Sequence, residues 1–204
     1  MQNLNDTLIE VRKAYRLIYD YQKRILDLIS FIKGRYDFIY LGGFSKFSNV
    51  SPRNGSGDLK SWSWDWLNLY YYDFHFQKKI IDKDDIRFSI FLMSDSGYFD
   101  KNKENSIQKI NPDLFLEPEA SKTKLIFVIG KNTWGLFGND NWNNINFTTE
   151  NYGYEKDEKG VMLFKSYDLD KFVDENTANQ TLVDFQSYCT GYNINLPIVE
   201  RKFV

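Results

Sequence analysis

The chain has 204 residues, of which 42% are hydrophobic and 26% are charged, and its formal net charge is -2. These values are typical of a globular protein and exclude a disordered chain, while the near-neutral charge gives no overall attraction to nucleic acid or anionic lipid. We expect a single domain over residues 1–204, with a long amphipathic helix over residues 1–36 and a sheet-containing body over residues 37–204.

The chain has one cysteine, Cys189, which excludes an intramolecular disulfide framework. Charged residues interrupt the first apolar positions, unlike a secretion signal, and no run of about 18 apolar residues occurs. We therefore expect a soluble, cytoplasmic protein.

The first predicted element is the long helix, because apolar residues recur seven apart in two interleaved columns. The first column is Leu4, Val11, Ile18, Ile25 and Ile32, and the second is Leu8, Tyr15 and Ile29, with Gln22 as its polar exception. The pattern has two interpretations: a core helix lying across a sheet, or a helix that pairs with a partner or with a second copy as a homodimer. A third apolar column, which includes Tyr21 and Leu28, favours the core interpretation.

Basic residues lie mostly away from these apolar columns, and few acids lie among them. Arg12, Arg16, Lys23 and Arg24 belong to this basic face. Nucleic-acid binding along the face is therefore an alternative function, although the net charge of the chain does not support it.

Aromatic residues are concentrated in the segment SWSWDWLNLYYYDFHF, residues 61–76, where they alternate with a period of two. This period predicts a strand, which we expect to be regular from Tyr70 to Ile80. A turn at Asp82 to Asp85 and a second alternating segment from Ile86 to Leu92 predict an antiparallel hairpin.

Two further strands are predicted after an irregular segment over residues 94–122. KLIFVIGK is apolar throughout, as expected for the centre of a sheet, and VMLFKSYDL follows after a polar, aromatic connection. Residues 170–188 predict one or two short helices. The fold class is therefore α+β, with the long N-terminal helix packed on a largely antiparallel sheet of four or five strands and with short C-terminal helices.

Asp65, Asp73 and His75 are the candidate catalytic residues. Asp73 and His75 are two apart on a predicted strand and share one face, opposite the face of the neighbouring aromatic residues. A metal site would need a further ligand from elsewhere in the chain. A metal-dependent hydrolase or nuclease is thus an alternative function.

Aromatic residues next to amides form the second candidate site, because flat apolar rings and amide groups suit stacked ligands or a protein partner. The candidate binding residues are Trp62, Trp64, Trp134, Trp142, Asn143 and Tyr152. We expect the first two to lie mainly in the core and the others to lie on the surface.

No phosphate-binding loop, nucleophile elbow or zinc motif occurs in the sequence, so we expect neither a cofactor nor a metal. The leading hypothesis is a non-enzymatic interaction protein that binds through the aromatic, Asn-rich surface and the long helix. We expect it to bind a protein partner or to self-associate through the N-terminal helix, and we expect no association with a membrane.

Overall fold

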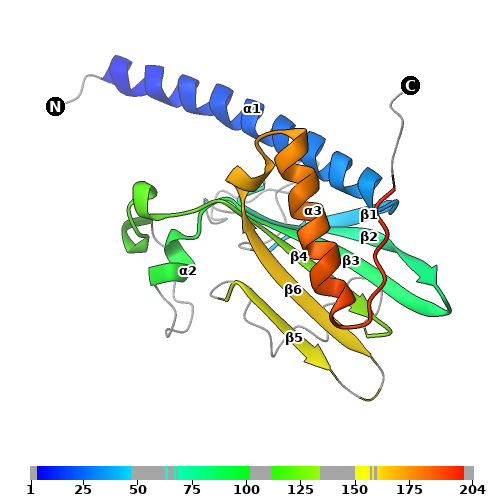
Figure 1. Cartoon of the computed structure of the whole chain (residues 1–204). Coiled ribbons are helices and arrows are strands. Elements are labelled where there is room, and N and C mark those ends of the chain that lie inside the picture. Colours follow the sequence, from blue (N-terminus) through cyan, green and yellow to red (C-terminus); the bar gives the residue numbers. More distant parts are fainter. Residues whose placement is uncertain are drawn as a thin grey trace, which may run out of the picture.

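The computed structural model describes residues 4–46, 63, 67, 69–101, 112–133, 150–156, 158 and 160–199. In these residues a long helix, α1 (Leu4–Arg35), precedes an antiparallel sheet, and α3 (Glu175–Thr190) follows it (Figure 1). The sheet strands are β1 (Tyr40–Ser45), β2 (Tyr71–Ile81), β3 (Asp84–Met93), β4 (Lys124–Lys131), β5 (Tyr152–Lys156) and β6 (Val161–Asp168). Shorter elements are α2 (Gly97–Lys101) and the 3-10 helices η2 (Pro112–Leu114), η3 (Pro118–Ala120) and η5 (Leu169–Phe172).

The described strands form one six-stranded sheet in the order β1-β2-β3-β4-β6-β5, and every neighbouring pair is antiparallel. The α+β class, the long helix and the antiparallel sheet are confirmed, but the expected number of four or five strands is too low. Neither edge strand, β1 or β5, is among the four segments predicted from the sequence. Both are short and only partly buried, and they are held by backbone pairing with β2 and β6.

The β2–β3 hairpin forms where the alternating pattern predicts it. Its two turn residues, Asp82 and Lys83, have φ values of 50° and 76°, the left-handed conformations that a two-residue turn requires. β4 lies between β3 and β6, and its six inner residues are buried, which confirms KLIFVIGK as a central strand.

The two faces of the sheet carry separate apolar clusters. On one face the second half of α1 and α3 pack on Phe74, Phe88 and Phe127. The opposite face carries the cluster Tyr71, Phe91, Met93, Tyr98, Ile126, Val128, Met162 and Phe164. Burial on both faces explains why the inner residues of β4 are apolar without interruption.

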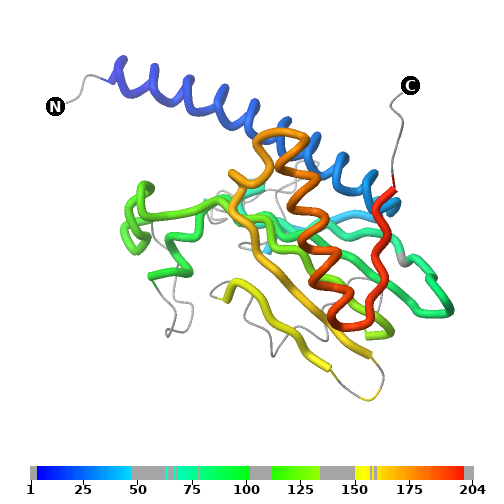
Figure 2. Tube along the Cα trace, viewed as in Figure 1, coloured from blue at the N-terminus to red at the C-terminus, as the bar shows by residue number. Residues whose placement is uncertain are grey.

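The two ends of α1 have different surroundings. Its second half, from Tyr21 onward, packs on the sheet through Ile25, Ile29 and Ile32, whereas residues 4–20 run beyond the sheet and all are exposed (Figure 2). None of the helices in the described part of the chain is both long and apolar enough to cross a membrane.

Candidate functional site

Asp73 and His75 meet in a chain of polar side chains on the face of β2 that points away from α1 and α3. His75 Nε2 lies 3.0 Å from Asp73 Oδ2, and His75 Nδ1 lies 2.8 Å from the Ser89 hydroxyl on β3. Lys46 Nζ, just beyond β1, lies 2.9 Å from the same Asp73 oxygen. We call Lys46, Asp73, His75 and Ser89 the buried polar chain.

The sequence places these groups together through strand register. His75 is directly opposite Ser89 of β3, and Asp73 is directly opposite Phe44 of β1. The Phe44 N–H also donates to Asp73 Oδ1 over 2.6 Å. Asp73 therefore ties the edge strand β1 to the sheet through a side chain as well as through the backbone.

The Asp73 carboxylate is kept charged despite its burial. Burial by itself raises the pKa of a carboxyl group, but the hydrogen bonds and positive charge offered by His75 and Lys46 outweigh it and hold the pKa of Asp73 below its ordinary value. A buried carboxylate with these partners is expected to be costly to protonate or remove.

Ser89, His75 and Asp73 have the connectivity of a catalytic serine triad, in which a histidine links the hydroxyl to a carboxylate. However, Asp73 is 0% exposed and His75 and Ser89 are each 1% exposed. A substrate carbonyl cannot reach the Ser89 hydroxyl in this conformation, so the geometry favours a structural role that links β1, β2 and β3.

Asp65, the third catalytic candidate, lies outside the described residues. Among the residues that are described, no three His, Cys, Asp or Glu side chains are grouped in a way that could hold a metal ion. The metal-dependent hydrolase hypothesis stays a prediction.

Of the six candidate binding residues, Tyr152 is the one that lies in the described part of the chain. Trp62, Trp64, Trp134, Trp142 and Asn143 lie outside the described residues, whereas Tyr152 on β5 is 67% exposed. Tyrosine rings from β5 and from α3 and the turn after it lie near one another there, with centroids 4.9 to 6.4 Å apart in the contacting pairs. This tyrosine surface consists of Tyr152, Tyr154, Tyr188 and Tyr192.

Lys165 and Asp184 form an ion pair beside the tyrosine surface, and Lys165 contacts the ring of Tyr188. Lys165 Nζ lies 2.6 Å from Asp184 Oδ2 and 5.5 Å from the ring centre of Tyr188. Burial raises the pKa of Tyr188, with its tyrosine neighbours adding to the effect, so this hydroxyl stays protonated at neutral pH.

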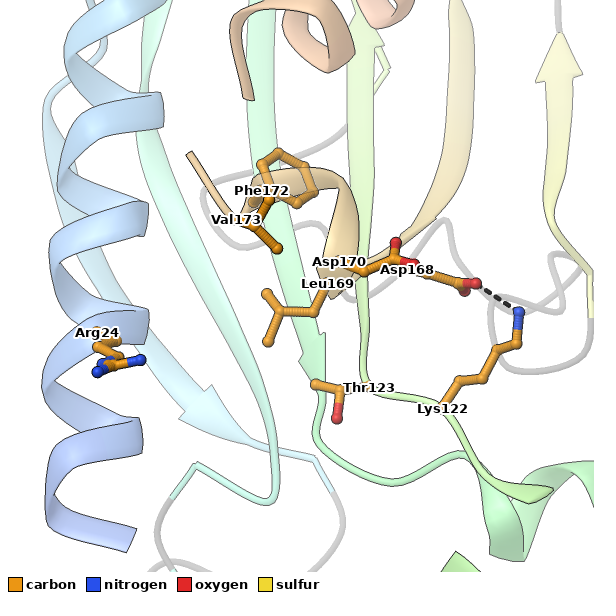
Figure 3. Close-up of a pocket in the computed structure, with 8 residues that line it drawn as sticks. All are labelled: Arg24, Lys122, Thr123, Asp168, Leu169, Asp170, Phe172 and Val173. Carbon is orange, nitrogen blue, oxygen red and sulfur yellow. Dashed lines mark hydrogen bonds and ion pairs between the residues drawn. The ribbon is translucent and has the colours of Figure 1, made fainter. Parts of the chain in front are cut away.

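A pocket of about 630 Å³ opens between α1 and η5 (Figure 3). Arg24 lines it from the helix side, and Lys122, Asp168 and Asp170 line it from the other side, where Lys122 and Asp168 form an ion pair. Cations and carboxylates are thus mixed along its wall, and this composition does not favour one charge class of ligand.

An exposed apolar surface lies on residues 4–20, which we call the projecting half of α1. Five of its apolar residues continue the columns that pack on the sheet further along the helix, and we call them the apolar stripe. These residues are Leu4, Leu8, Val11, Tyr15 and Ile18, and all are exposed. The second half of α1 begins at Tyr21, whose hydroxyl lies 3.0 Å from the Ser94 hydroxyl.

The projecting half carries no net charge. Its three bases, Arg12, Lys13 and Arg16, are balanced by the three acids Asp6, Glu10 and Asp20. The structure also separates the predicted nucleic-acid residues, because Arg24 lines the pocket while Arg12, Arg16 and Lys23 are exposed elsewhere on α1. Local attraction to a polyanion is therefore weak, and nucleic-acid binding stays a prediction.

Comparison with known proteins places the chain in a family. The profile of the PM0109 family matches residues 1–193, which include the whole of α1. The chain belongs to the PM0109 family. The Pasteurella multocida (strain Pm70) protein PM0109 is 29% identical to it over 125 residues, which are 55% of this chain and 59% of that protein. The chain thus spans less than two thirds of the length of this relative, and no solved structure matches it.

Proposed function

We propose that this PM0109-family protein is a non-enzymatic interaction protein and that the projecting half of α1 is its main binding surface. The observation that carries the proposal is the apolar stripe, which continues past the body of the protein into solvent. Contiguous apolar residues on a folded surface are typical of a binding site.

The shape of the stripe favours a helix as the bound element. Its residues recur at the alternating spacings of three and four that form the narrow seam of a coiled coil. Burial of one such side chain contributes about 1.5–3 kcal/mol, so a partner that covers the seam gains several such contributions. The zero net charge of the projecting half supports a protein partner more than an anionic membrane or nucleic acid.

The tyrosine surface supports a second, smaller contact region. Tyr152 and Tyr154 are both exposed, and aromatic side chains that present an apolar ring and a hydroxyl are frequent in interfaces.

Site-specific photo-crosslinking of the full chain in cells tests the proposal. A photoreactive residue replaces Leu8 on the stripe and, as a matched control, Leu17, which is also an exposed leucine of α1. Nine residues correspond to two and a half turns, so Leu17 lies on the opposite side of the helix. We expect a discrete crosslinked product from position 8 and none from position 17.

The same experiment has a clear negative result. If position 8 yields no crosslinked product, or if both positions yield the same diffuse products, the stripe is not a specific binding surface and the proposed function is wrong. The mass of a discrete product also tells whether the bound protein is a second copy of this chain or a different protein.

A further inference from the structure

A second, smaller pocket lies between the second half of α1 and the strands β1 and β2. We infer that this pocket binds a small carboxylic acid with one aromatic ring, the ring lying against the apolar walls and the carboxylate lying at Lys33. The inference concerns a different part of α1 from the apolar stripe, and it does not depend on the proposed function.

The helix side of the pocket is a single face of α1. Leu26, Ile29, Ser30 and Lys33 line it, and residues three and four apart lie on the same side of an α-helix. The two apolar residues of this set come first along the helix, and the two polar residues include the last one. The wall therefore has an apolar part and a polar part, as a ligand with one apolar end and one charged end requires.

The sheet side of the pocket consists of aromatic rings. Tyr40 of β1 pairs with Phe76 of β2, and the ring centre of Tyr40 lies 6.0 Å from that of Phe76 and 6.3 Å from that of Phe74. Both phenylalanines are buried, whereas Tyr40 is 45% exposed, so Tyr40 lies on the solvent side of the pocket.

The volume of the pocket, about 160 Å³, limits the size of the ligand. An apolar cavity of about 150 Å³ holds one benzene ring, whereas pockets for drug-sized ligands have about 300–1,000 Å³. Aromatic rings also attract one another through edge-to-face and offset contacts, beyond the effect of apolar burial. The walls and the volume together favour a ligand with one aromatic ring.

The charge of the ligand follows from Lys33. It is partly buried and carries the only formal charge among the described residues that line the pocket. No carboxylate in the described part of the chain forms an ion pair with its ammonium group. A cation in this position favours an anion, and the Ser30 hydroxyl, one helix turn earlier, is available as a second donor to a carboxylate.

The other polar groups near the pocket do not oppose an anion. Burial raises the pKa of Tyr40 to about 12, with Tyr72 and Asp73 adding to the effect, so the Tyr40 hydroxyl is uncharged at neutral pH. The Asp73 carboxylate lies on the opposite face of β2, where Lys46 and His75 contact it.

Titration of the isotope-labelled full chain with phenylacetate, followed by the NMR shifts of its backbone amides, tests the inference. Phenethyl alcohol and phenethylamine are the matched probes, because they keep the ring and the number of carbon atoms but end in a neutral and a cationic group. We expect phenylacetate to bind most tightly and to shift the amide signals of Ser30, Lys33 and Tyr40.

Two lysine variants test the role of the charge. Lys33→Gln should weaken phenylacetate binding about tenfold, as expected for the loss of one hydrogen bond between charged groups, and should leave phenethyl alcohol binding unchanged. Lys23→Gln, at an exposed position of α1 away from the pocket, should bind phenylacetate like the wild type. The readout has to be binding rather than stability, because a lysine in the last turn of a helix also stabilises the helix end.

Three results would overturn the inference. The first is the absence of amide shifts with phenylacetate at millimolar concentration, and the second is equal affinity for phenylacetate and phenethylamine. The third is an unchanged affinity for phenylacetate in Lys33→Gln. None of these results bears on the photo-crosslinking at position 8, so the inference and the proposed function fail separately.

Discussion

The two halves of α1 have the same sequence pattern but opposite environments. Ile18 and Ile32 occupy the same column of the heptad, two repeats apart, yet Ile18 is exposed and Ile32 is fully buried in the core cluster. The comparison shows that a heptad pattern predicts which face of a helix is buried. It does not tell which element or molecule buries that face. In the second half the cover is the protein's own sheet, and in the projecting half we propose that it is another molecule.

Truncation of Ile32 and of Ile18 to alanine should give the largest difference in the free energy of unfolding. Ile32→Ala should lower the free energy of unfolding by about 2–5 kcal/mol, because it removes buried methyl groups and leaves a cavity. Ile18→Ala should change it by less than about 0.5 kcal/mol, because its side chain is exposed in the single chain. Urea unfolding of both variants, at a concentration low enough to keep the chain monomeric, measures the difference. Equal losses would mean that the projecting half is packed on the body in solution.

Removal of the buried Asp73 charge should have the next largest effect. Asp73→Asn should destabilise the fold by about 1–3 kcal/mol, since it weakens the contacts with Lys46, His75 and the Phe44 N–H. The matched change Asp20→Asn in the projecting half should leave the free energy of unfolding unchanged.

The pH dependence of the same variant tests the cause. Because the pKa of Asp73 is lowered in the folded protein, its contribution to stability is present above the ordinary value of 3.8 and is lost as the pH falls through the folded value. Thermal unfolding measured from neutral pH downward should therefore show a shallower loss of stability in Asp73→Asn than in the wild type over this acidic range. An unchanged acid profile would show that Asp73 is not a charged member of the buried polar chain.

A smaller effect is expected at the junction of the two halves. Tyr21→Phe removes the hydroxyl contact with Ser94 and should cost about 0.5–1.5 kcal/mol, whereas Tyr19→Phe, at an exposed position, should cost nothing measurable. Amide hydrogen exchange should place the faster exchange of Tyr21→Phe in the helix turns around residue 21. Equal effects of the two variants would mean that the boundary between the two halves of α1 does not lie at Tyr21.

The sequence was sufficient to predict most of the fold because the apolar patterns of its main elements are strong. The heptad columns predict α1, the period of two predicts β2 and β3, and the apolar run KLIFVIGK predicts a central strand. β5 was not predictable in this way, because an exposed strand held by backbone hydrogen bonds needs no apolar side chains. The two edge strands that were not predicted, β1 and β5, account for the error in strand number.

The candidate sites were predictable to a lesser extent. The shared face of Asp73 and His75 follows from their spacing on one strand, and the structure shows them in contact. Their partners, Ser89 and Lys46, come from β3 and from the residue after β1, and no local pattern reports on cross-strand register. The same face of the sheet carries a second apolar cluster, assembled from residues far apart in the chain, which no local pattern predicts.

Pull-down of the full chain from cells tests the role of the projecting half most directly, with Leu8→Glu on the stripe and Leu17→Glu on the opposite side as a matched pair. We predict that the wild type and Leu17→Glu recover the same bound protein, whereas Leu8→Glu loses it although the purified variant remains folded. A Leu8→Glu variant that still recovers the bound protein, or a Leu17→Glu variant as impaired as Leu8→Glu, would contradict binding through the apolar stripe.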